Sequence, residues 1–376
     1  MLKKIIFISV LSFTILFAQE TKKIAFGPYL QNMTTRSATI CWSTFESNTK
    51  ITSPDGTSKI ILEYEQHTIE LSRLTANSDY EYDVLNNGSG EGFGKFKTYP
   101  KDISPFKFVV LGDTRSNPVV HSKIVSGIIR QDPLFVVNTG DMISNGRDIK
   151  NWESFFEVNN KLMRNVPYYA VLGNHEKDSP YYYDFFPPPG DNNYYSFSVG
   201  DALFVILDSE GKNISAPNYL TDDYEDQFWS DSFKEYFQAQ KDWLEKELTL
   251  NQDAGFIFVF QHQPLYSIKK SRVEDTNKYR EFWGDIFERH NVQFFINGHD
   301  HHYHHALNKG VHYITTAGGG AGLYETDSPQ PETVKFSKIN HFLSVNMDIE
   351  TATINVIDLD GNEIDKIVVE KRKSNK

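Results

Sequence analysis

The chain has 376 residues, with 50 acidic against 38 basic side chains and a formal net charge of -12 at pH 7. This negative potential argues against nucleic acids and anionic membranes as main partners, so a small anionic substrate needs local cations to enter a site. The single cysteine, Cys41, excludes an internal disulfide. With 39% hydrophobic residues, a chain this long is globular and exceeds one ordinary domain.

Residues 1–18 have the order of a secretory signal peptide. Lys3 and Lys4 precede an apolar run from Ile5 to Phe17, which is short for a membrane span. We therefore expect cleavage after this segment, export to the periplasm or the medium, and no stable membrane span in the mature chain. An uncleaved anchor is the alternative, because Leu16 stands where a cleavage site favours a small residue.

Residues 22–100 carry short strand-like runs separated by turn signals. Apolar and polar residues alternate from Ala38 to Ser43, which is typical of a half-buried strand, and further runs lie at Tyr80 to Val84 and Gly92 to Thr98. This pattern predicts a small antiparallel sandwich without catalytic chemistry. It resembles a fibronectin type III domain, and Gly27 to Asn32 resembles the opening of the N-terminal domain of purple acid phosphatases.

From Phe106 onward, apolar runs alternate with amphipathic segments, the signature of an α/β architecture. Five apolar runs each end in a polar motif. The motifs are Gly112-Asp113, Gly140-Asp141, Gly173-Asn174-His175-Glu176, Gln261-His262 and Gly298-His299-Asp300-His301. The loops beyond the carboxyl ends of strands form the ligand crevice in such sheets, so we expect the motifs to converge.

The motif side chains are carboxylates, one amide and several imidazoles. Such oxygen and nitrogen donors suit zinc, iron or manganese and differ from the thiolate sites of structural zinc. The glycine before Asp113, Asp141, Asn174 and His299 lets the backbone turn tightly. Two ions about 3.5 to 4 Å apart would lower the pKa of a shared water and polarise phosphoryl oxygens. No Gly-x-Ser-x-Gly motif supports a covalent serine mechanism.

The order of the motifs resembles the calcineurin-like metallophosphoesterases, and among them the purple-acid-phosphatase branch, over nearly all of residues 22–370. The resemblance implies an α/β (α+β) four-layer sandwich in residues 104–370, with two mixed β-sheets packed face to face between helices. It also implies two divalent or trivalent ions (Fe, Zn or Mn). Together with the predicted signal peptide, it predicts an exported, metal-dependent hydrolase of small phosphorylated substrates that acts by attack of a metal-activated water.

The resemblance also assigns roles to the motif residues. Asp141 would bridge the two metals. Asp113 and His301 would bind the first, and Asn174, His262 and His299 would bind the second. His175 would contact the phosphoryl group or protonate the leaving group, which is general acid help worth about 10²- to 10⁴-fold.

Two positions depart from the family pattern. Arg115 stands where most of the superfamily has a metal-binding His, and Ser144 stands where the purple enzymes have a Tyr. The first metal is therefore one protein ligand short, and a tyrosinate colour should be absent. Three interpretations stay open: the first ion binds weakly through water or Ser144, His121 replaces the ligand, or the centre works with one tight ion.

Arg115 has two interpretations of its own. Its planar guanidinium matches phosphate oxygens and would grip the substrate, or it pairs with a nearby carboxylate. We interpret His302, His304 and His305 as loop imidazoles outside the ligand set.

The remaining segments add structural expectations. Residues 209–236 form a polar, aromatic insertion that resembles a lid, Gln240 to Leu248 form a helix, and His341 to Val369 form closing antiparallel strands. The basic tail, residues 371–376, is expected to be disordered. Monoesters are the favoured substrates. Nucleotide or headgroup diesters, and a catalytically weakened binding protein, are the alternatives, and the oligomeric state is open.

Overall fold

The computed structural model describes residues 4–8, 24–45, 49–52, 58–61, 64–86, 89–101, 104–190, 193–211 and 231–373. The chain forms two compact units. The first comprises Met1–Lys101 with Phe156–Tyr168, and the second comprises Asp102–Phe155 with Tyr169–Lys376. Most of the predicted signal peptide, residues 212–230 of the insertion and the last three residues lie outside the described residues.

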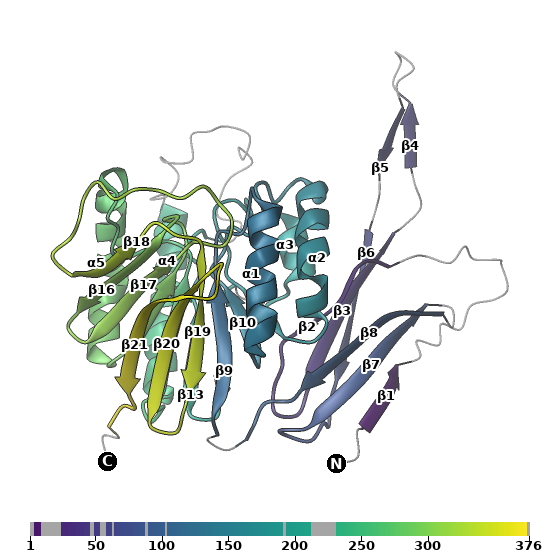
Figure 1. Ribbon diagram of the computed structural model, residues 1–376, viewed down its shortest axis with the longest axis horizontal. Coiled ribbons are helices and arrows are strands. Elements are labelled where there is room, and N and C mark those ends of the chain that lie inside the picture. Colours follow the sequence, from purple (N-terminus) through teal and green to yellow (C-terminus); the bar gives the residue numbers. More distant parts are fainter. Residues whose placement is uncertain are drawn as a thin grey trace. The chain divides into compact units, whose positions relative to one another are not determined.

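The first unit consists of small β-sheets together with the C-terminal half of helix α2 (Ile149–Met163). Its strands are β1 (Lys4–Ile8), β2 (Ile24–Gln31), β3 (Ala38–Phe45), β4 (Thr49–Thr52), β5 (Ser58–Ile61), β6 (Tyr64–Leu71), β7 (Asp79–Asn86) and β8 (Ser89–Lys97). They form sheets in the orders β1-β7-β8, β2-β3-β6 and β4-β5, antiparallel except for β1 with β7 (Figure 1). The small antiparallel sheets predicted from the sequence are confirmed.

Strand β3 is buried on both faces, not on one as its alternation predicted. Its polar residues are accommodated by hydrogen bonds, as where Ser43 donates to Gln66 Oε1 at 2.5 Å. Cys41 lies on the same strand, and burial raises the pKa of its thiol to about 12, so it stays protonated and unreactive. Phe156 of α2 stacks on Phe26 at 5.0 Å between ring centroids, which explains why this part of α2 belongs to the first unit.

The second unit contains two mixed sheets. The six-stranded sheet has the order β11-β10-β9-β19-β20-β21, and the seven-stranded sheet has the order β12-β13-β14-β15-β17-β16-β18. Strands β9 and β10 are parallel, as are β13, β14, β15 and β17 in succession. The strands are β9 (Phe106–Leu111), β10 (Phe135–Asn138), β11 (Tyr168–Ala170), β12 (Tyr195–Val199), β13 (Ala202–Ile206), β14 (Phe256–Gln261), β15 (Phe294–Asn297), β16 (Tyr303–Asn308), β17 (Val311–Thr316), β18 (Thr333–Ser337), β19 (His341–Met347), β20 (Thr351–Asp358) and β21 (Glu363–Glu370).

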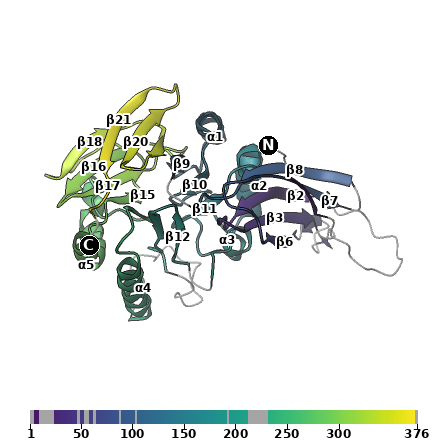
Figure 2. The ribbon, with the colours of Figure 1, turned by 90° about the horizontal axis from the view of Figure 1, so that it is seen from below.

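Helices cover the outer faces of the two sheets. They are α1 (Pro118–Gln131), the first half of α2, α3 (Pro180–Phe185), α4 (Asp231–Leu250) and α5 (Val273–Arg289), which follows the short 3₁₀ helix η1 (Lys270–Arg272). In Figure 2, α4 and α5 lie on one side of the seven-stranded sheet, with β20 and β21 of the other sheet on its far side. Helix α1 packs against β19 of the six-stranded sheet. The predicted sandwich of two mixed sheets with helices is confirmed.

Aromatic side chains join the two sheets. Phe108 of β9 meets Phe204 of β13 and Phe258 of β14 edge to face, with ring centroids 5.1 and 5.2 Å apart. The neighbouring residues of β13, Leu203 and Val205, belong instead to the core that includes residues of α4 and α5. Both faces of these strands are therefore buried, which is why the sequence shows continuous apolar runs there.

The closing strands and the helix around Gln240 agree with the sequence prediction, whereas the expected disorder of the whole tail is wrong. Lys371 donates its backbone N–H to Glu350 O at 2.8 Å, and its ammonium pairs with Asp201. Arg372 Nη1 donates to Ala254 O at 2.8 Å. These contacts order the first part of the tail against the second unit. No helix among the described residues combines the length and hydropathy that a membrane span requires.

Replacement of Phe204 by Ala should lower the free energy of unfolding by about 3 to 5 kcal/mol, because it removes a ring that contacts both sheets. Urea denaturation measures this change. Val368→Ala is the control, since Val368 is 55% exposed, and should change stability by no more than about 0.5 kcal/mol. Equal effects of the two substitutions would contradict the assignment of the inter-sheet core.

Candidate metal centre

The polar motifs lie beyond the carboxyl ends of parallel strands in both sheets. Asp113 and Asp141 follow the neighbouring strands β9 and β10, and His262 and His299 follow the neighbours β14 and β15. Because the two sheets pack face to face, these four loops meet at one edge of the sandwich. The structure therefore brings the predicted site residues together.

The ligand residues themselves adopt left-handed backbone conformations. The φ angles are 57° at Asp113, 55° at Asp141 and 70° at His299. Such angles are uncommon for residues other than glycine and cost free energy that the surrounding contacts must offset. The motif glycines serve a different purpose at two positions. A Cβ on Gly298 would lie 2.7 Å from Asp113 Oδ2, and one on Gly173 would lie 2.5 Å from Asp141 N, so only glycine lets these loops approach.

Four side chains converge at the site predicted for the second metal. His262 Nε2 lies 3.1 Å from Asn174 Oδ1, 3.2 Å from His299 Nδ1 and 3.4 Å from Asp141 Oδ1. His262 Nδ1 lies 2.8 Å from Thr139 O and donates to it, which directs the Nε2 lone pair at the other three atoms. One carboxylate, one amide oxygen and two imidazoles form a donor set that suits a borderline divalent cation. Asp141 and His262 are buried, and Asn174 and His299 are half-buried.

The protonation of this cluster depends on its charges. Burial lowers the pKa of His262, but the negative charges of Asp141 and Asp113 outweigh it and raise this pKa to about 9. Burial holds the pKa of His299 well below its usual range, and Arg272 adds to the effect. His299 is therefore neutral, the form that binds metals. A cation in the cluster would displace the proton on His262.

A second group lies beside the first. Ligand atoms of Asp113, Asp141 and His301 all lie within 4.8 Å of one another, and all three residues are buried. His301 Nδ1 donates to Gly322 O at 2.7 Å, so its Nε2, 3.3 Å from Asp113 Oδ1, carries a lone pair. Asp113 Oδ1 accepts no hydrogen bond from the described residues. These are the residues predicted for the first metal.

Arg115 enters this second group. Its Nε donates to Asp141 Oδ2 at 3.2 Å, and its Nη2 lies 3.2 Å from His301 Nε2. Of the two interpretations of Arg115, pairing with a nearby carboxylate is the one that the structure shows. The side chain is still 17% exposed.

His175 lies at the rim of the centre. Its backbone N–H donates to Asp141 Oδ1 at 2.9 Å, and its Nδ1 donates to Ser144 O at 2.8 Å. Its Nε2 lies 3.8 Å from Asp141 Oδ2, and 27% of the side chain is exposed. Burial lowers the pKa of His175, and the charge of Asp141 opposes that shift. Nε2 is thus the ring atom that a substrate can reach.

His121 lies outside the candidate ligand group, and the Ser144 hydroxyl contacts Ser116. His121 is the fourth residue of α1, and its buried ring packs against Phe155 at 5.9 Å between centroids. Ser144 Oγ lies 3.2 Å from Ser116 Oγ. Among the described residues, the acidic and imidazole groups close enough to share an ion at the first position do not include His121.

The histidines after the last motif do not extend the ligand set. His304 and His305 lie on strand β16, not in a loop as expected. His304 Nε2 lies 3.0 Å from Thr333 Oγ1, and His305 Nε2 lies 2.9 Å from His312 Nδ1. His302 is buried, and burial lowers its pKa to about 4. These imidazoles are neutral parts of the packed interior.

Glu176 has a role that the sequence reasoning missed. Its Oε2 accepts the N–H groups of Asp141 at 2.9 Å and Gly173 at 2.8 Å, and its Oε1 accepts the N–H of Met142 at 2.8 Å. Burial, followed by the charge of Asp141, raises its pKa to about 8. The sequence contained a hint of this role, because Glu176 is the one acidic residue in the third motif and was not assigned as a metal ligand.

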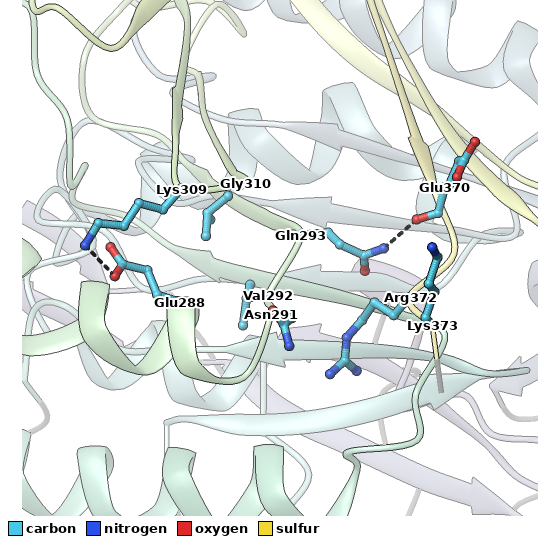
Figure 3. Close-up of a pocket in the computed structure, with 10 residues that line it drawn as sticks. Glu288, Asn291, Val292, Gln293, Lys309, Gly310, Glu370, Arg372 and Lys373 are labelled. Carbon is cyan, nitrogen blue, oxygen red and sulfur yellow. Dashed lines mark hydrogen bonds and ion pairs between the residues drawn. The ribbon is translucent and has the colours of Figure 1, made fainter. Parts of the chain in front are cut away.

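A polar cavity of about 350 Å³ lies at the opposite edge of the seven-stranded sheet (Figure 3). Its lining includes Val292 and Val311, at the amino ends of β15 and β17. Two of the lining residues, Lys309 and Glu288, form an ion pair at 2.8 Å. The lining of the cavity contains no histidine. Parallel-sheet sites lie at the carboxyl ends, so this cavity is not the candidate site.

Comparisons with known proteins identify the family of the chain. Curated proteins similar to this chain include an uncharacterized protein of Mycobacterium tuberculosis, 24% identical over 62% of this chain and 49% of its own length. Purple acid phosphatase 13 of Arabidopsis thaliana is 25% identical over 69% of this chain and 55% of its own length. The chain thus spans about half the length of these relatives.

Among solved structures, the purple acid phosphatase PPD1 from yellow lupin (Lupinus luteus) seeds has a TM-score of 0.72. The match covers 91% of this chain and 74% of the lupin chain, at 18% identity, and so establishes the shared fold. The model of the family described as calcineurin-like phosphoesterase matches residues 106–303, more than half of the chain. The resemblance seen in the motifs is therefore confirmed: this chain belongs to the calcineurin-like phosphoesterase family.

Proposed function

We propose that this protein is an exported hydrolase of phosphate esters that depends on metal bound at the candidate centre. The observation that carries the proposal is the convergence of Asn174, His299 and Asp141 on His262 Nε2, with ligand atoms 3.1 to 3.4 Å from it. Asp141 and His262 are buried, and Asn174 and His299 are half-buried. A cation between these atoms would displace the proton on His262 and accept a lone pair from each of them. Monoesters are the favoured substrates, because relatives with a named activity are called phosphatases.

The chain's own residues define what the centre does to a substrate. When bound, the metal supplies Lewis acid polarisation of a phosphoryl oxygen and a nucleophile at neutral pH. Asp141 and His299 hold their strained conformations because Glu176 and Asp113 accept their backbone N–H groups. His175 Nδ1 donates to Ser144 O, so Nε2 is the ring atom that faces the substrate. In the imidazolium form, which the charge of Asp141 favours, Nε2 carries a proton that passes to the leaving group.

A catalytically weakened binding protein is the second candidate. It is favoured by one observation, the contact of Arg115 with two residues of the first predicted metal position. A centre that has lost its catalytic ion would keep affinity for phosphorylated ligands through this guanidinium. The hydrolase would turn over phosphate esters, whereas the binding protein would bind them without hydrolysis.

Turnover of paired aryl substrates separates the candidates. The purified protein should contain metal and hydrolyse p-nitrophenyl phosphate faster than bis-p-nitrophenyl phosphate. Chelation should abolish this activity, and Zn²⁺ or Mn²⁺ should restore it, because the ligand set holds such ions. Faster diester turnover would reverse the assigned ester class. Metal without turnover of either substrate would favour the binding protein.

Replacement of His175 by Ala should lower kcat about 10²- to 10⁴-fold, since it removes the proton donor, and should leave the metal content unchanged. His67→Ala is the matched control, because His67 has the same 27% side-chain exposure and lies in the first unit. An unchanged kcat in His175→Ala would remove His175 from the mechanism.

Replacement of Glu176 by Gln should weaken metal binding about 10- to 100-fold, because the new amide cannot accept all three N–H groups that position the ligand loops. The buried unpaired donor should also lower stability by about 1 to 3 kcal/mol. Calorimetric titration with Zn²⁺ at a temperature where both proteins are folded measures the affinity. Glu281→Gln, at an exposed position of α5, is the control. Equal affinities for Glu176→Gln and the wild type would refute the positioning role.

A further inference from the structure

We propose that the guanidinium of Arg115 takes the place of the first metal ion, so that the centre holds one tight ion, at the second position. This inference rests on the proposed function, because it requires that the centre binds metal. It predicts one ion per chain. Of the three interpretations that the sequence left open, it selects the centre that works with one tight ion.

Arg115 contacts two of the three ligand atoms that a first ion would need, Asp141 Oδ2 and His301 Nε2. Asp141 directs Oδ1 toward His262, in the second cluster, and Oδ2 toward Arg115 Nε. The carboxylate thus bridges a metal cluster and a guanidinium, where the two-metal arrangement would have it bridge two ions. His301 donates from Nδ1 to Gly322 O, so its Nε2 accepts from Arg115 Nη2 and is not free for a metal.

The backbone holds Arg115 in this position. Its N–H donates to Asp141 O at 3.3 Å. The preceding residues are covered by the glycine-rich segment after β17, where Gly319 N donates to Gly112 O at 2.9 Å and Ala321 N donates to Asp113 O at 2.8 Å. A Cβ on Gly320 would lie 2.6 Å from Thr114 O, which shows how closely the two segments approach. The guanidinium therefore starts from a fixed point beside the ligands.

The charges of the centre favour the same conclusion. Asp113 and Asp141 are buried carboxylates with two negative charges, and Arg115 with one divalent ion supplies three positive charges, so one positive charge is left to face the substrate phosphate. A second divalent ion at the first position would lie against the guanidinium and leave a large buried positive charge. Buried unbalanced charge is strongly unfavourable, so the first ion and Arg115 exclude one another.

The other ligands of the first position remain in place. Asp113 Oδ1 is buried without a hydrogen bond from the described residues, and His301 Nε2 lies 3.3 Å from it. Removal of the guanidinium should therefore open a site whose two remaining side chains are already oriented. A histidine at position 115 would replace the cation by a neutral nitrogen donor and complete the set.

The same contacts give Arg115 a function in the one-ion centre. Its Nη1 reaches Ser116 Oγ at 3.5 Å, the longest of its three side-chain contacts, and the side chain is 17% exposed. A planar guanidinium at the mouth of the centre matches two oxygens of a phosphoryl group. In the one-ion centre, the Arg115 guanidinium neutralises the part of the substrate phosphate's charge that a first ion would otherwise neutralise.

Metal stoichiometry tests the proposal directly. The full-length protein, saturated with Zn²⁺ or Mn²⁺ and freed of loose metal by gel filtration, should hold one ion per chain by elemental analysis. Arg115→His should hold two. With Mn²⁺, the wild type should give the electron paramagnetic resonance signal of an isolated ion, and Arg115→His the signal of a coupled pair.

Two further variants control for charge and for the substitution itself. Arg115→Lys keeps the positive charge and should retain one ion. Arg115→Gln removes the charge and should admit a second, more weakly held ion, which calorimetric titration with Zn²⁺ counts without a gel-filtration step. Arg147→His, at an exposed position of a neighbouring loop, should retain one ion. Near-ultraviolet circular dichroism verifies that each variant is folded, and Arg115→Gln decides the question if Arg115→His does not fold.

The outcomes are distinct from those for the proposed function. Two tight ions in the wild type would overturn the role of Arg115 and leave the metallophosphoesterase assignment intact. One ion in both Arg115→His and Arg115→Gln would also overturn it. No bound ion in any protein, with no turnover, would overturn the proposed function and this inference with it.

Discussion

The centre depends on one carboxylate, Asp141, whose two oxygens face two different partners. Oδ1 faces the imidazole of His262, and Oδ2 accepts from the guanidinium of Arg115. A buried carboxylate can exist only where positive charge or donors surround it, so the loops that supply these partners must close around it. Because those loops come from both sheets, the partners of Asp141 reach it only when the two sheets are packed correctly against each other.

Closing the loops around Asp141 strains the backbone of the ligand residues. Asp113, Asp141 and His299 all lie in the left-handed region, and each is held by a hydrogen bond that crosses from one motif to another. Arg272 adds a further tie by donating to His299 O at 2.9 Å and pairing with Asp300. The site is thus preorganised by backbone hydrogen bonds to buried acids, which sequence motifs do not display as such.

The sequence predicted the parts of the molecule that follow from periodicity and strand ends. The apolar runs before Asp113 and His299 became central strands, and their motifs met, because parallel strands place their carboxyl ends at one edge. The burial of both faces of β3, the position of His305 on β16 and the ordered Lys371 depend on neighbours distant in sequence. No local pattern contains that information. Glu176 lay within a recognised motif, yet its role as an acceptor of three N–H groups depends on two loops meeting in space.

Arg115 also changes how the centre relates to folding. In a metal-dependent module the ligands repel one another until an ion arrives, so folding requires the metal. Here a covalently attached cation lies between Asp141 and His301 and offsets part of that repulsion. A guanidinium cannot lose its charge in the physiological pH range, so this stabilisation persists whatever the supply of ions. Arg115 is therefore a permanent cation among the candidate ligands, and a metal would bind beside a positive charge that the chain itself supplies.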